Sequence, residues 1–128
     1  MHKSFLLTGA ILAGLGVVLG AFGAHGLKKL VGPETVSTFQ TGVQYQMYHA
    51  FGLLLIAILF QQFHNTLLQW AGVFFIGGIV LFSGSLYLLS LLKAKGTVGI
   101  SGIGILTPIG GLLFITGWIL LVLAVLKK

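Results

Sequence analysis

The chain has 128 residues, of which 57% are hydrophobic and 6% charged, whereas about a quarter of the residues in a soluble domain carry charge. Its net charge of +6 comes from seven lysines and one acid, Glu34. The lysines stand at the ends of apolar segments and form no cluster, which excludes a nucleic-acid partner and is typical of side chains that reach lipid headgroups. The absence of cysteine excludes disulfides and thiolate chemistry.

Four apolar segments follow one another, and each is long enough to cross a hydrocarbon core of about 30 Å as a helix. We expect these helices at approximately residues 5–24, 44–62, 67–92 and 103–126. The first follows a short basic start and resembles a signal peptide, but its length of about 20 residues favours a retained helix. The pattern predicts an all-α fold, an integral membrane four-helix bundle that occupies residues 1–128 as one domain.

A polar segment separates the first two helices. Pro33 and Glu34 resemble the first turn of a helix, and apolar residues recur from there at helical spacing. An unbroken helix from Pro33 to Gln62 would be about 45 Å long, which exceeds the hydrocarbon thickness. We therefore expect a bend near Gly42, with an amphipathic segment at residues 33–43 lying in the interface.

The candidate site consists of polar side chains that the up-and-down helix order brings to one membrane pole. In the second helix they share one stripe, because positions three and four apart lie on the same face. The ends of the first and third helices and the start of the fourth lie at the same pole. The ligand-binding candidates are His25, Gln44, Tyr45, Tyr48, His49, Ser83, Tyr87, Ser90 and Thr107.

Two interpretations of these candidates stay open. Hydrogen bonds from such side chains ordinarily join membrane helices, each contributing about 0.6–2 kcal/mol. An ionisable group inside a membrane is instead a functional hypothesis by default, which makes His49 the strongest candidate. His25 is expected near the interface, and His2 and His64 at the surface.

Catalytic and metal sites lack the residues that they require. Glu34 is the sole carboxylate, so a pair of acidic catalytic groups is excluded within one chain. Ser83 has no nearby acid to orient a histidine, and His25 and His49 have no third strong ligand at motif spacing. We expect a non-enzymatic protein without metal or cofactor, and a haem or metal protein is the weakest alternative.

Small residues line two faces of the first helix. One face contains a Gly16-x-x-x-Gly20 motif, and Ala10, Gly14 and Ala21 form the other. Because small residues let membrane helices approach closely, we expect the first helix to be central, or to pack both within the chain and against another subunit. The expected helix-packing residues are Gly9, Ala13, Gly16, Gly20 and Gly23, with Gly104 and Gly111 in the fourth helix.

The positive-inside rule separates the two orientations weakly. The side of the chain ends carries three lysines and the opposite side four. The early position of Lys3 favours cytoplasmic N- and C-termini in a multi-pass protein of the plasma membrane.

Several sequence blocks stand out: Gly20–His25, the stretch from Phe39 to His49, Leu81–Tyr87, and Thr107–Gly111 with Gly117-Trp118. Taken together, they resemble the small membrane proteins grouped as domain of unknown function 423, which are related to eukaryotic transmembrane protein 256. The resemblance covers nearly the whole chain and implies a bacterial four-helix protein of the plasma membrane. It implies no activity.

Two functional hypotheses follow. The first is a polar pocket at one membrane pole that binds or passes a small molecule, lipid headgroup or ion, because the polar stripe around His49 converges there. The alternative is a structural or assembly subunit that associates with another membrane protein, or with itself, through its glycine-rich helix faces. In either case the lipid bilayer is the first partner.

Overall fold

The computed structural model describes residues 2–96 and 102–127, which contain helices and no strand. Four helical spans in these ranges are long and apolar enough to cross a membrane, which confirms the predicted all-α membrane fold. They are α1 (Lys3–Ala24), α2 (Pro33–Leu59), a third span made of α3 (Thr66–Gly78), the π-helical turn η2 (Ile79–Ser83) and α4 (Gly84–Ala94), and finally α5 (Leu106–Lys127). The short 3-10 turns η1 (Leu27–Lys29) and η3 (Ile103–Ile105) precede α2 and α5.

Local sequence signals account for where these helices begin. His2 caps α1, because its Nδ1 accepts a hydrogen bond from the Phe5 backbone N at 3.2 Å, and Asn65 caps α3 in the same way through Leu68 N at 3.1 Å. Pro33 starts α2. The imidazole of His2 is also stacked on the Phe5 ring, with 3.9 Å between the ring centroids, and it is hydrogen-bonded to Gln69. His2 is therefore half-buried, which corrects the expectation of a surface position.

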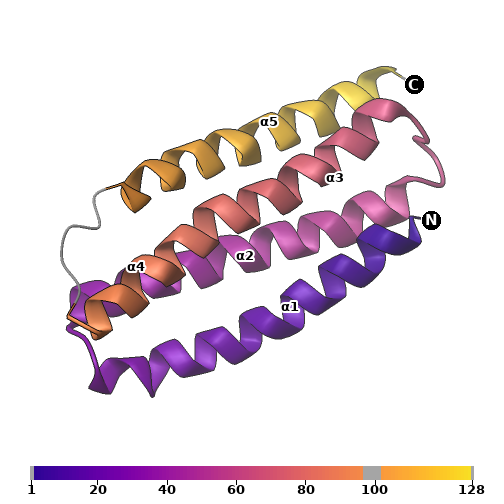
Figure 1. Cartoon of the computed structure of the whole chain (residues 1–128). Helices are drawn as coiled ribbons and strands as arrows, with labels where there is room; N and C mark the ends of the chain where they lie inside the picture. Colours follow the sequence, from indigo (N-terminus) through magenta and orange to yellow (C-terminus); the bar gives the residue numbers. More distant parts are fainter. Residues whose placement is uncertain (1, 97–101, 128) are drawn as a thin grey trace.

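The helices form an open arrangement in which α1 and α5 occupy opposite edges (Figure 1). Helix α1 packs along α2, whereas α5 packs along α3 and η2. Both chain ends lie at the same end of the molecule (Figure 1). The central position considered for the first helix is therefore wrong, and its second small face, with Ala10, Gly14 and Ala21, is exposed.

Close helix contacts rest on glycine where α1 meets α2. A Cβ added at Gly9 would lie 2.9 Å from the carbonyl oxygen of Ala50, and one at Gly23 would lie 2.9 Å from the Phe39 ring. Gly16 faces Met47 in the same way. These residues repeat every seven positions and form the face of α1 that contacts α2. Ala13 lies beside this face and is half-buried.

Two expectations need correction. Helix α2 runs unbroken through Gly42, so residues 33–43 and the following span are one helix. Gly42 is a packing position: a Cβ there would lie 2.9 Å from the Tyr87 ring. In α5 the close contacts fall at Gly110, against the Phe82 backbone, and at Gly117, against Phe75.

The packing role expected for Gly104 and Gly111 is therefore misplaced. A Cβ at Gly104 would meet nothing within 4 Å, and one at Gly111 would be 3.9 Å from Phe82. The physical reason is that the face of α5 turned toward the third span carries Gly110, against η2, and Gly117, against α3; both are buried and lie seven residues apart.

Candidate functional site

His49 lies in the middle of the molecule and is 4% exposed. Its Nδ1 is 2.8 Å from the carbonyl oxygen of Tyr45, and its Nε2 is 3.0 Å from Nε1 of Trp118 in α5. An indole N–H can only donate and a carbonyl can only accept, so the partners assign a neutral imidazole with its proton on Nδ1. The ring also stacks on that of Phe114, with 3.6 Å between the two ring centroids. Both nitrogens of His49 are thus used inside the protein.

Gln46 joins three helices. Its Nε2 donates to the carbonyl oxygen of Leu12 in α1 at 2.7 Å, and its Oε1 accepts from the hydroxyl of Tyr87 in α4 at 2.6 Å. The side chain is 3% exposed. Gln46 is absent from the candidates that the sequence suggests, although its position carries a signal: Gln46 lies three residues after Val43 and four before Ala50, on the apolar face of the helix.

The other candidates on the third span also bind within the protein. Ser83, in the π-helical turn, donates to the carbonyl oxygen of Gly42 at 2.6 Å, and Ser90 donates to Leu86 at 2.8 Å. Ser85 and Thr107 share a hydrogen bond of 2.5 Å between the third span and α5. Over residues 2–96 and 102–127, every buried side-chain nitrogen and oxygen has a hydrogen-bond partner. The interior polar groups therefore satisfy one another.

Four candidates are exposed. His25 is exposed at the end of α1, where its Nδ1 is 3.0 Å from the carbonyl oxygen of Ala21. Gln44, Tyr45 and Tyr48 are exposed on α2. The stripe expected around His49 is thus divided, because His49 turns inward with Gln46 while Gln44 and Tyr48 face outward. The ring of Tyr45 lies between the two sets, with its centroid 4.8 Å from that of Phe82.

Gln44 and Tyr48 belong to an exposed stripe that we call the outer face of α2: Gln44, Tyr48, Phe51, Leu55 and Ile58. Between Gln44 Nε2 and the Tyr48 hydroxyl there is a hydrogen bond of 2.6 Å. The exposed fractions of Tyr48, Phe51, Leu55 and Ile58 are 50%, 55%, 45% and 52%. Helix α2 therefore presents one uncovered face that is polar at one end and apolar at the other.

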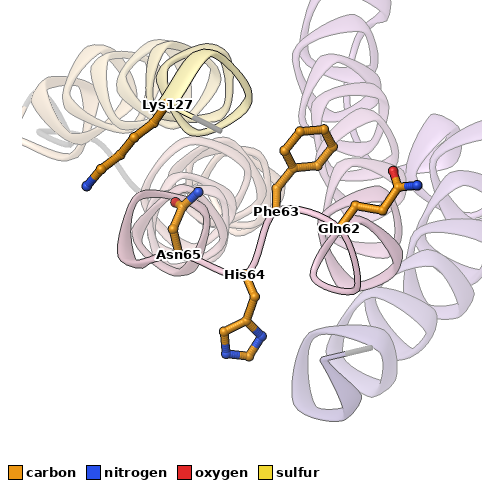
Figure 2. Close-up of a pocket in the computed structure, with 5 residues that line it drawn as sticks. All are labelled: Gln62, Phe63, His64, Asn65 and Lys127. Carbon is orange, nitrogen blue, oxygen red and sulfur yellow. The ribbon is translucent and has the colours of Figure 1, made fainter.

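Three cavities of the described part of the chain lie at the two poles. One of about 260 Å³ is lined by Gln62, Phe63, His64, Asn65 and Lys127 (Figure 2). A second of about 260 Å³ shares His64 and Asn65, and a third of about 190 Å³ lies beside Lys28 and Pro33. None of the three is lined by a candidate residue. Within the described ranges there is also no group of three or more residues that could hold a metal ion.

Comparison with known proteins identifies relatives along the whole chain. The family described as "Protein of unknown function (DUF423)" matches residues 19–111. The UPF0382 membrane protein YwdK of Bacillus subtilis is 46% identical, with 98% of each chain covered. A UPF0382 membrane protein of Staphylococcus epidermidis is 43% identical over 98% of this chain and 97% of its own.

The UPF0382 inner membrane protein YgdD of Escherichia coli is 37% identical over 99% of this chain and 93% of its own. No solved structure matches. The matches agree with the four apolar spans and confirm both the multi-pass membrane location and the resemblance seen in the sequence blocks. The chain belongs to the DUF423 family of membrane proteins.

Proposed function

We propose that the protein is a non-catalytic membrane subunit that binds another membrane-spanning chain through the outer face of α2. The observation that carries this proposal is the Gln44–Tyr48 pair, whose amide and hydroxyl are exposed on the surface that faces lipid in a single copy. This keeps the assembly role inferred from the sequence but moves it from α1 to α2. The face of α1 with Gly9, Gly16 and Gly23 packs against α2, and its exposed face with Ala10, Gly14 and Ala21 carries no polar side chain.

The depth of the pair follows from its neighbours. Met47 lies against Gly16, and Gln46 bonds to the carbonyl of Leu12. Both partners are close to the middle of α1, which spans Lys3–Ala24 and crosses the membrane. Tyr48 therefore lies near the centre of the bilayer, and Gln44 lies one helical turn away.

Polar groups at this depth need partners. An amide offers two N–H donors and a carbonyl acceptor, and a tyrosine hydroxyl both donates and accepts. The pair makes one hydrogen bond with itself, and a polar group left unsatisfied in hydrocarbon costs several kcal/mol. A partner chain with hydrogen-bonding side chains would satisfy the remaining capacity.

Ligand binding or conduction, which the sequence places at one membrane pole, is the second candidate. The exposure of Gln44, Tyr45 and Tyr48 favours it, because amide and hydroxyl groups on the protein surface can also hold a small polar molecule. The inward residues support it less, because His49 and Gln46 are already bonded within the chain. A polar molecule that co-purifies with the protein and is lost in Gln44→Leu would favour this second role.

Photo-crosslinking tests the assembly role. Phe51 is replaced by p-benzoylphenylalanine, which leaves Gln44 and Tyr48 in place. The matched control carries the same group at Val18 of α1, which is 64% exposed, compared with 55% for Phe51. Irradiation of native membranes should give a protein adduct from position 51 that is absent at position 18 and weakened by Gln44→Leu. An absence of adducts at position 51, or equal adducts at both positions, contradicts the proposal.

A further inference from the structure

We infer that the chain bound by the outer face of α2 is a second copy of the same protein, joined through a parallel α2–α2 contact in which Gln44 faces Gln44. This inference rests on the proposed function and specifies the partner. Its first support is the spacing of the face: Gln44, Tyr48, Phe51, Leu55 and Ile58 follow each other at intervals of four, three, four and three. That spacing keeps the five residues, the seam of the proposed contact, on one face of α2, as a contact between two helices requires.

The seam is open along its length. Helix α1 contacts α2 through Val43, Met47 and Ala50, and α5 approaches on the side of His49. The apolar seam residues of α2 are each about half exposed, so within the described part of the chain no helix covers them. A partner helix can therefore reach the seam without displacing α1 or α5.

Symmetry determines which residues would meet. Two copies inserted in the same orientation are related by a two-fold axis along the membrane normal, and an interface on that axis brings each seam residue close to its own counterpart. Phe51 would then meet Phe51, and Gln44 would meet Gln44. The face has to be complementary to itself.

The chemistry of Gln44 meets this requirement. An amide carries a partially positive N–H group and a partially negative carbonyl oxygen, so two facing amides have complementary charges and exchange hydrogen bonds. A single buried amide in a coiled-coil seam also selects the register and the number of strands. Tyr48, bonded to Gln44 at 2.6 Å, holds the amide on this face. A lysine or an acid in the middle of the seam would repel its own copy, and the seam contains neither.

Cysteine crosslinking tests the inference cleanly, because the chain contains no cysteine of its own. Single variants Phe51→Cys, Leu55→Cys and Ile58→Cys are oxidised in native membranes with a reagent that enters lipid. The controls are Leu54→Cys, on the adjacent face of α2 that meets Gly9, and Ile115→Cys, which is 58% exposed on α5. Disulfide dimers are expected from the three seam variants and not from the two controls.

A second substitution tests whether the dimer depends on the Gln44 amide. Gln44→Leu in the Phe51→Cys background should lower the crosslinked fraction about five- to tenfold, and Gln44→Asn should restore part of it. Crosslinking of the seam residues to a protein of different mass, with no disulfide dimer, overturns the second copy and leaves the proposed function intact. If neither the disulfide dimer nor a photo-adduct at position 51 forms, both are wrong. A dimer fraction that is unchanged by Gln44→Leu overturns the role of the amide pair.

Discussion

His49 is the residue whose structural role is most sharply defined by its neighbours. The indole of Trp118 donates to its Nε2, and its Nδ1 donates to the backbone of Tyr45. An imidazole held from both sides joins α2 to α5 and leaves no ring nitrogen free for a ligand. This geometry favours the structural interpretation of the histidine over a metal or proton site.

Trp118→Phe should therefore destabilise the protein, because it leaves the buried Nε2 of His49 without a donor. We expect a loss of about 1–3 kcal/mol in the free energy of unfolding, measured by SDS titration of the purified protein. Trp70→Phe is the matched control, since that indole is 51% exposed, and its effect should stay within about 0.5 kcal/mol. Equal effects of the two substitutions would show that the hydrogen bond to His49 contributes nothing.

Gln44 and Gln46 form a matched pair for a second test. Gln46→Leu removes hydrogen bonds to Leu12 and Tyr87 and leaves the Tyr87 hydroxyl without its acceptor. We expect it to lower the free energy of unfolding by about 1–2 kcal/mol. In dilute detergent, where single copies prevail, Gln44→Leu should change it by less than about 0.5 kcal/mol. The reverse order of the two effects would contradict the assignment of inner and outer faces.

At the scale of helices, the sequence predicted the membrane spans well. It predicted poorly which face of each helix contacts its neighbours. Twenty or so apolar residues define a span whatever surrounds it, so all four were found. Gly42 was misinterpreted because a glycine in a helix weakens it locally, whereas here it makes room for the Tyr87 ring. Gln46 faces inward and Gln44 faces outward because of where α1 packs against α2. The His49–Trp118 contact spans 69 positions, and no local pattern encodes it.

The π-helical turn is a second reason why the sequence did not predict which helix faces contact each other. Residues 79–83 contain extra backbone in each turn, which changes the phase between α3 and α4. A helical wheel drawn through the whole span then misplaces residues on one side of the turn. Within the π-helical turn, the backbone of Phe82 lies against Gly110 of α5. Side-chain periodicity does not reveal this contact.

Gly110→Ala should be among the most damaging small substitutions in the chain. The new methyl group would overlap the backbone nitrogen of Phe82, which cannot move as a side chain can. We expect a loss of about 1–3 kcal/mol or more in the free energy of unfolding. Gly14→Ala, where the methyl group meets nothing within 4 Å, should be neutral or stabilise by up to about 1 kcal/mol. Similar effects at both positions would contradict the packing described for α5.

At the scale of the whole molecule, both chain ends lie at one end of the bundle (Figure 1). We predict that this end is cytoplasmic, because Lys3 is the first charge to meet the insertion machinery. A C-terminal fluorescent fusion should be bright and a C-terminal alkaline phosphatase fusion inactive. The lysine counts of the two sides are close. The double substitution Lys28→Gln and Lys29→Gln removes two lysines from the opposite side, so it should raise the fluorescence and keep the phosphatase fusion inactive. An active phosphatase fusion in the unmodified chain would reverse the assigned orientation.

The central claim is that two copies associate through the outer face of α2. Its most direct measurement is the mass of the protein extracted with its native lipids, determined by native mass spectrometry. We predict twice the 13.6 kDa of one chain, with a shift to the single mass in Gln44→Leu because the amide pair is lost. A single chain mass for the unmodified protein would contradict the claim.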